Sequence, residues 1–110
     1  MAASGARIHG SGAAVTYHDG NYLALMHTLE QGEYRTFAYK FESFPPFAIV
    51  AVSQQLPLQG APHAFPSGLA IPPSADKVVV SYGVRDAEAR VLVMSFDFLD
   101  ALFSWCEDGS

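Results

Sequence analysis

The sequence predicts an all-β protein made of two tandem antiparallel units, each of a four-stranded type, with a short C-terminal helix. Three observations support this fold class: an internal repeat, alternation of apolar and polar residues, and turns rich in glycine and proline. Half of the 110 residues are hydrophobic and only 15% are charged. The composition is therefore that of a globular protein with a packed core.

The repeat appears when segment 11–14 (SGAA) is laid on segment 67–70 (SGLA). After a one-residue adjustment in a loop, the hydrophobic pattern stays aligned between the two copies. Three further residues then coincide: Glu33 with Glu88, Arg35 with Arg90, and Phe41 with Phe96. Two units of about 55 residues are implied.

The first unit contains four predicted strands: Ala13–His18, Tyr22–Thr28, Arg35–Glu42 and Phe47–Ser53. Asp19-Gly20 separates the first two and is a strong hairpin signal, because both residues tolerate the backbone angles of tight turns. Pro45-Pro46 precedes the fourth, since such a pair does not fit the interior of a sheet.

The second unit repeats only three strands: Phe65–Ile71, Lys77–Tyr82 and Glu88–Ser95. Asp97–Trp105 then places its apolar residues at helical spacing, which predicts a short terminal helix. We therefore expect a first repeat at 1–55, a Pro/Gly linker at 56–64, and a second, incomplete repeat at 65–110.

Four antiparallel strands in about 50 residues are typical of a β-propeller blade, and two blades cannot close a ring. The sequence therefore favours a partial β-propeller. The alternative is a small β-sandwich, in which two sheets pack face to face and hide both apolar faces.

Charge and composition argue against several partners. The net charge is −5, and the six lysines and arginines form no basic stripe, so nucleic acid is not expected. No apolar run is long enough to cross a membrane, and no signal peptide is recognisable, which predicts a cytoplasmic protein. The single cysteine, Cys106, cannot form an internal disulfide.

Metal and nucleophile sites are not expected either. His9, His18 and His27 are predicted to fall on different strands, unlike the close ligand pairs of zinc sites. Ser67 lacks the nucleophile-elbow motif of hydrolases. Arg35 and Arg90 are related by the repeat, so we expect both to perform one structural task beside Glu33 and Glu88.

Three segments carry a family resemblance: DGNYLALMH at 19–27, FPSG at 65–68 and SYGVRD at 81–86. They resemble the DGW-aliphatic-YH, FPTG and YYGAAD motifs in the C-terminal blades of five-bladed β-propellers. That group includes the inverting β-mannoside phosphorylases and related glycosidases. The segments are also similar to propeller domains that accompany glycosyltransferases.

The resemblance implies a carbohydrate partner and, for a phosphorylase, inorganic phosphate as well. It assigns substrate binding to Asp86, through sugar hydroxyls, and to His27, near the phosphate or nucleophile. Tyr82 and Tyr34 add stacking surface or a phenolic donor. Arg85 stands where the family has a small residue, and we expect it to face solvent.

Two functions remain open. The chain is either the C-terminal part of a propeller glycoside phosphorylase or glycosidase, inactive alone, or a non-catalytic carbohydrate-binding or interaction module associated with a glycosyltransferase. No catalytic residue, cofactor or metal is assigned, because the resemblance places the general acid outside this chain. Exposed blade faces predict packing against further blades or self-association.

Overall fold

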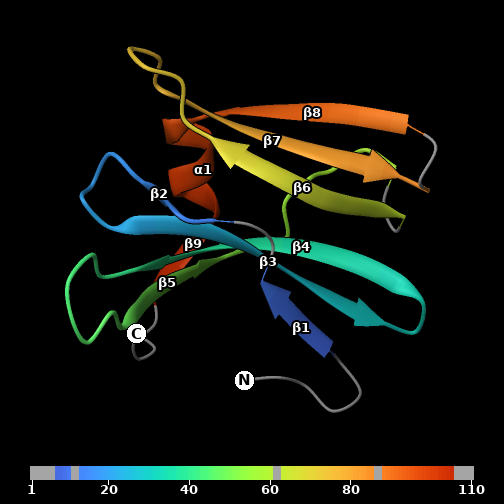
Figure 1. Ribbon diagram of the computed structural model, residues 1–110, viewed down its shortest axis with the longest axis horizontal. Coiled ribbons are helices and arrows are strands. Elements are labelled where there is room, and N and C mark those ends of the chain that lie inside the picture. The colour runs from blue at the N-terminus through green and yellow to red at the C-terminus, as the bar shows by residue number, and fades with distance from the viewer. Residues whose placement is uncertain (1–6, 11–12, 61–62, 86–87, 106–110) are drawn as a thin grey trace.

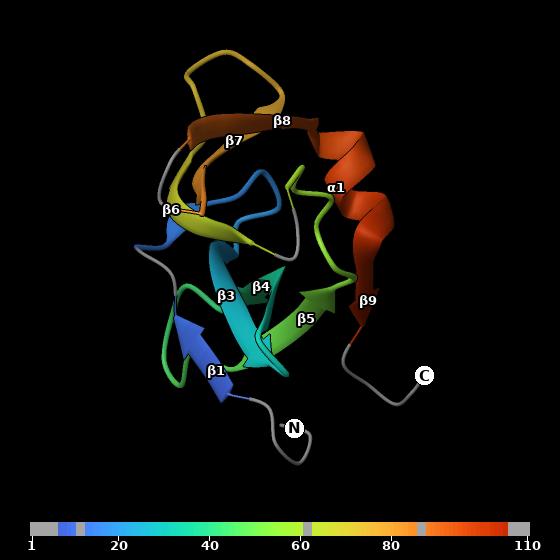
Figure 2. The ribbon, with the colours of Figure 1, turned by 90° about the vertical axis from the view of Figure 1, so that its right-hand side faces the viewer.

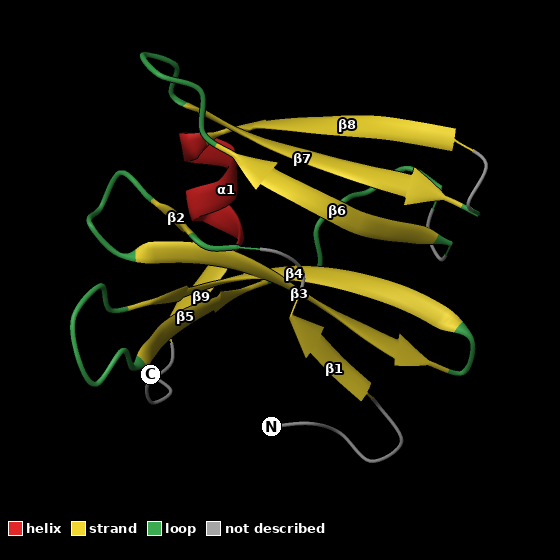
Figure 3. Cartoon of the chain, viewed as in Figure 1, coloured by secondary structure: helices red, strands yellow, loops and turns green. Residues whose placement is uncertain are grey.

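The computed structural model describes residues 7–10, 13–60, 63–85 and 88–105. Two antiparallel sheets lie one above the other (Figure 1). Strands make up most of the chain, and the single described helix is short (Figure 3). The predicted all-β class, with antiparallel sheets and a short helix near the C-terminus, is confirmed. The sheets have six and three strands in place of two units of the four-stranded type.

The large sheet has the strand order β1-β3-β4-β5-β9, and β2 pairs with β3 beside β1. Its β3–β4 hairpin turns at Gln31-Gly32, where both residues have positive φ (54° and 78°). Positive φ at both central residues is the geometry of the hairpin turn that matches strand twist. The strands are β1 (Arg7–Gly10), β2 (Val15–Thr16), β3 (Tyr22–Glu30), β4 (Glu33–Phe41), β5 (Ile49–Ser53) and β9 (Phe103–Trp105).

The small sheet is a three-stranded meander of β6 (Ala64–Ala70), β7 (Lys77–Val84) and β8 (Glu88–Ser95). Along β7 every second side chain is buried, from Val78 to Val84. This alternation places one face of the sheet on the core and leaves the other outward. On the outward face of β8, Val91 and Val93 are 60% and 53% exposed.

The helix differs from its predicted bounds. It is α1 (Phe96–Leu102), capped by the Ser95 hydroxyl, which accepts a hydrogen bond from Phe98 N at 3.0 Å. At Phe103 the backbone becomes extended and β9 begins, pairing antiparallel with β5. The predicted helix Asp97–Trp105 is therefore too long at its C-terminus, because backbone pairing with β5 replaces the last helical turn.

The C-terminal segment joins the two sheets. In Figure 2, α1 runs down from the end of β8 and β9 continues into the large sheet. The second sequence unit therefore supplies a strand to the sheet formed by the first. The two units share one hydrophobic core and do not pack separately.

The core is filled from both sheets, the helix and the connection between the sheets. Within the predicted Pro/Gly linker 56–64, Leu56 and Leu58 are only 2% and 6% exposed, so this segment belongs to the core. Leu56 N also donates to Thr36 O at 2.8 Å. The buried cluster comprises Tyr17, Leu23, Leu25, Ala38, Leu56, Leu58, Ala64, Val78, Val80, Tyr82, Val84, Met94 and Leu99.

The arginines related by the repeat each lie beside a glutamate. Arg35 lies 3.6 Å from Glu33, and Arg90 lies 2.9 Å from Glu88. The pairs occupy equivalent places on the β3–β4 and β7–β8 hairpins. The predicted neighbours are therefore present, and a shared structural task for the two arginines stays a prediction.

The two sheets face one another across the shared core, which is the arrangement of the β-sandwich alternative. The described residues form no closed ring of sheets. Within the described ranges, no helix has the length and apolar character needed to cross a membrane.

Candidate functional site

A pocket of about 440 Å³ opens where the starts of β4, β6 and β8 meet the end of β7. We call it the aromatic pocket. Its lining mixes aromatic rings with hydroxyl, imidazole and guanidinium groups. It is formed by Tyr34, His63, Phe65, Ser67, Tyr82, Gly83, Arg85 and Ala89.

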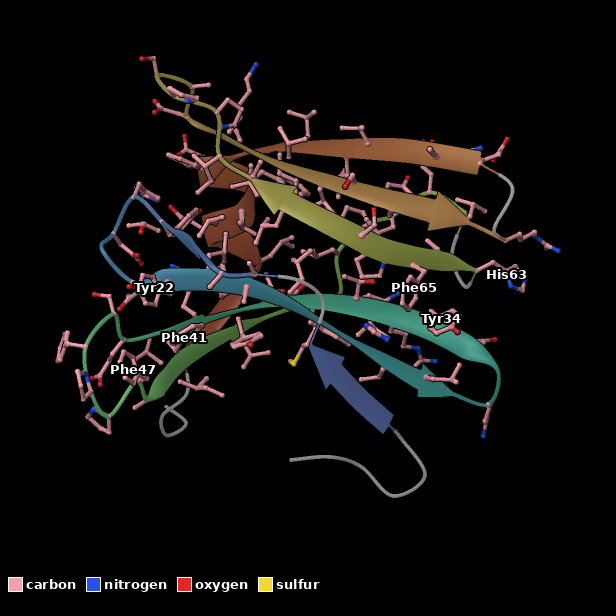
Figure 4. The ribbon with its side chains drawn as sticks, viewed as in Figure 1. Tyr22, Tyr34, Phe41, Phe47, His63 and Phe65 are labelled. Atoms are coloured by element: carbon pink, nitrogen blue, oxygen red, sulfur yellow. The ribbon has the colours of Figure 1, made fainter. Side chains whose placement is uncertain are left out.

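Two aromatic rings from different sheets form one side of this pocket. Tyr34 on β4 and Phe65 on β6 meet edge to face, with ring centroids 5.4 Å apart. Figure 4 shows them close together near His63. Phe65 is 44% exposed although its neighbours Ala64 and Pro66 are buried, because alternate residues of β6 point to opposite faces. An apolar ring therefore remains accessible beside the pocket.

His27, predicted from the resemblance to bind substrate, lies behind these rings. Its ring centroid is 4.7 Å from that of Phe65 and 5.9 Å from that of Tyr34, both in edge contacts. Only 6% of the residue is exposed, and it is not among the lining residues. In this structure the ring of His27 packs against the two aromatic rings that line the pocket.

Tyr82, the second predicted binding residue, does line the aromatic pocket. It is 3% exposed, and its phenolic oxygen accepts a hydrogen bond from Gln59 N at 3.0 Å. This bond anchors the connection between the sheets to β7. Asp86, the third predicted residue, lies outside the described residues.

Three polar side chains of the lining were not expected to bind: His63, Ser67 and Arg85. Arg85 N donates to His63 O at 3.3 Å, which holds these two residues together at the ends of β6 and β7. Arg85 is exposed, as expected, and also borders the aromatic pocket. The FPSG and SYGVRD motifs contain Ser67 and Arg85, so the sequence held a signal for them, whereas nothing in it singled out His63.

The Arg85 backbone is unusual for a residue with a side chain. Its φ is 55°, in the left-handed region that L-residues avoid because Cβ approaches the backbone. Conformations of this kind occur often at binding and active sites. The left-handed turn starts where β7 ends, directly at the edge of the aromatic pocket.

A second polar cluster, the lysine network, ties the β2–β3 turn to α1. Lys40 Nζ is 2.9 Å from Asp19 Oδ2 and 3.9 Å from Asp100 Oδ1, and its side chain is only 4% exposed. The ammonium also lies over the rings of Tyr17 and Phe103, 4.8 and 4.4 Å from their centroids. These contacts compensate a buried charge and join three parts of the fold.

Protonation within the lysine network follows from these contacts. Burial, and then the neighbouring Asp100, raise the pKa of the Tyr17 phenol, which donates to Asp100 Oδ1 at 2.7 Å. Burial opposes ionisation of Asp19, but hydrogen bonds from Lys40 and the Asn21 backbone outweigh it and lower the pKa of this carboxyl. His18 Nε2 lies 3.0 Å from Asp100 Oδ2. We interpret the network as a structural clamp.

Within the described part of the chain, no three potential metal ligands lie close enough to hold an ion. His9 and His27 do lie on different strands, as predicted, but they are direct partners in the β1–β3 register. A second aromatic group, which includes Tyr22, Phe41 and Phe47, lies at the opposite end of the large sheet, away from the aromatic pocket (Figure 4).

Comparison of the chain with models of protein families, with curated proteins and with solved structures finds no match.

Proposed function

We propose that the chain binds carbohydrate in the aromatic pocket and has no catalytic activity by itself. The observation that carries this proposal is the chemistry of the lining: the exposed ring of Phe65 stands beside the hydrogen-bonding groups of Ser67, His63 and Arg85. Sugars present apolar C–H faces and hydroxyl edges, so an aromatic ring with adjacent donors and acceptors suits them.

Ligand-observed NMR with mannobiose and a panel of methyl glycosides tests the proposal. We expect binding in the millimolar range and about a tenfold loss of affinity in Phe65→Ala, because the ring supplies most of the accessible apolar contact. Phe98→Ala is the matched control, since Phe98 is similarly exposed (46%) but lies on α1, outside the lining. Failure of every sugar to bind the wild-type chain would overturn the proposal.

Phe65 also contacts His27 and Tyr34, so its loss could loosen the fold. Phe65→Leu keeps an apolar side chain there without the ring. If ring stacking drives binding, Phe65→Leu loses affinity while thermal unfolding stays close to that of the wild type. Equal affinity of Phe65→Leu and wild type would contradict stacking.

Catalysis is expected to be absent from the isolated chain. Glycoside cleavage needs a carboxylic acid placed against the scissile bond, and the described lining of the aromatic pocket contains no carboxyl group. An assay with aryl β-mannosides, with and without phosphate, should therefore show no turnover. Turnover that disappears in Asp86→Ala would instead support an enzyme with Asp86 at its active site.

The propeller context is a further part of the proposal. A blade within a larger propeller covers its outer face with the next blade, and the outward Val91 and Val93 are consistent with such a neighbour. In that setting the aromatic pocket supplies one side of a larger sugar site. A carbohydrate-binding module would need no further blade, and the same titrations test this alternative.

A further inference from the structure

The aromatic pocket collects positive charge in an acidic chain. The protein carries eleven Asp and Glu residues against six Lys and Arg. Among the described lining residues, however, the charged side chain is Arg85, and no acidic side chain is present. His63 adds an imidazole to the same lining. The described lining of the aromatic pocket thus has a charge of opposite sign to the net charge of the chain.

Arg85 also differs from the other arginines whose side chains are described. Arg35 and Arg90 each stand beside a glutamate, at 3.6 and 2.9 Å. No carboxylate within the described ranges pairs with the Arg85 guanidinium. A guanidinium presents a planar fork of donors that matches a carboxylate or phosphate in two parallel hydrogen bonds.

The Arg85 backbone favours this role further. A left-handed φ at a residue other than glycine carries an energetic cost, and here it occurs at the edge of the aromatic pocket. The hydrogen bond from Arg85 N to His63 O holds that geometry in place. Arg85 and the accessible ring of Phe65 therefore both border the aromatic pocket.

From these observations we infer that the aromatic pocket selects sugars that carry an anionic substituent, with the ring of Phe65 contacting the sugar face and Arg85 pairing with the anion. The inference rests on the proposed carbohydrate function and narrows its substrate class. A uronic acid and a sugar phosphate share the required chemistry. Each has a sugar ring and an anionic group whose two oxygens can accept two parallel hydrogen bonds from a guanidinium.

The test compares two ligands that differ at one carbon: methyl β-glucuronide, with a carboxylate, and methyl β-glucoside, with a hydroxymethyl group. Glucose 6-phosphate forms the third arm and distinguishes phosphate from carboxylate. In a low-salt buffer we expect the wild-type chain to bind at least one of the two anionic sugars about tenfold more tightly than the glucoside, because charge-assisted hydrogen bonds are the stronger kind. Added salt should reduce this preference.

Single substitutions test whether Arg85 causes the preference for anionic sugars. Arg85→Gln should abolish the preference, so that the anionic sugars bind no more tightly than the glucoside, and Arg85→Lys should retain part of it, since the charge remains but the fork is lost. Lys77→Gln removes the same charge from the opposite end of β7 and should leave the preference intact.

The outcomes separate the two proposals. Equal binding of glucoside, glucuronide and sugar phosphate would overturn this inference and leave the carbohydrate function standing. The inference also fails if the preference survives in Arg85→Gln. Absence of binding by all three sugars would overturn this inference, and it would overturn the carbohydrate function as well if mannobiose and the other methyl glycosides also failed to bind.

Discussion

Arg85 combines an unfavourable backbone with an exposed charge at the edge of the aromatic pocket. Its φ of 55° carries a steric cost that glycine does not have. Neither buried contacts nor a described ion pair explains an arginine at this position. Arg85 shares its positive φ with Gln31, Phe47 and Ser74, and among these four residues Arg85 lines the aromatic pocket.

Replacement of Arg85 by glycine should separate stability from binding. Arg85→Gly is expected to raise the free energy of unfolding by about 0.5–1 kcal/mol, because glycine adopts positive φ without strain. The same variant should lose the preference for anionic sugars. Urea unfolding measures the first effect and sugar titration the second.

Arg90→Gly provides the comparison, since Arg90 lies in the regular strand β8 and is not among the residues with positive φ. It should lower the free energy of unfolding, because glycine weakens a strand interior. A loss of stability in Arg85→Gly comparable to that in Arg90→Gly would show that the Arg85 backbone is not strained.

Gly60 illustrates a residue fixed by close packing. Its φ is 96°, and a Cβ built there would lie 2.8 and 2.9 Å from the two methyl carbons of Val84. Gly60→Ala should therefore destabilise the protein by about 1–3 kcal/mol, through backbone strain and overpacking together. Gly32→Ala is a suitable comparison in thermal unfolding, because it shares the positive φ but meets no atom within 4 Å. Equal losses in both variants would exclude the Val84 contact as a cause.

At the element scale, strand β8 forms an open edge of the small sheet and exposes two valines on its outer face. Open edges and apolar sheet faces are where β proteins associate. Val91→Thr combined with Val93→Thr should increase the monomer fraction at high concentration in analytical ultracentrifugation. Thermal stability should change little, because both side chains are already more than half exposed. An unchanged association state would show that this face is not responsible for self-association.

Individual elements were predicted to different degrees. Strands β3 to β8 lie close to their expected positions, because turn signals bound them and β4, β5 and β7 also show alternating burial. Strands β1 and β9 were not expected. Each pairs along only one edge of a longer strand and has few residues, so its extended form depends on a partner distant in sequence.

At the scale of the whole molecule, the lysine network closes the fold by linking the β2–β3 turn, β4 and α1. The pKa of Asp19 is lowered in the folded state, so its ionised form stabilises the protein above the ordinary carboxyl value of 3.8. This contribution is lost as the pH falls below 3.8 and through the lower folded pKa.

Asp19→Asn should therefore reduce stability at neutral pH and weaken the acid dependence of unfolding. Urea unfolding at pH 7 and at steps between pH 5 and 2.5 measures both effects. Asp76→Asn is the control, because Asp76 is exposed and forms no ion pair with the described residues. Parallel acid profiles for Asp19→Asn and the wild type would show that the Lys40 pair does not stabilise the fold through its charge.

Local patterns in the sequence were enough to predict the all-β class, most of the strands, and the positions of Arg35 and Arg90 beside Glu33 and Glu88. These features depend on local patterns, such as alternation, turn residues and charges at fixed spacing.

Three relations became visible in the tertiary structure alone. Strand β9 pairs with β5 of the large sheet, and Leu56 and Leu58 are buried in the common core. The ring of His27 packs against that of Phe65. The tertiary structure also placed Arg85 beside His63 and Phe65 at the aromatic pocket. The physical reason is that these relations join residues far apart in the chain. They depend on how two sheets pack across one core, which no local pattern specifies.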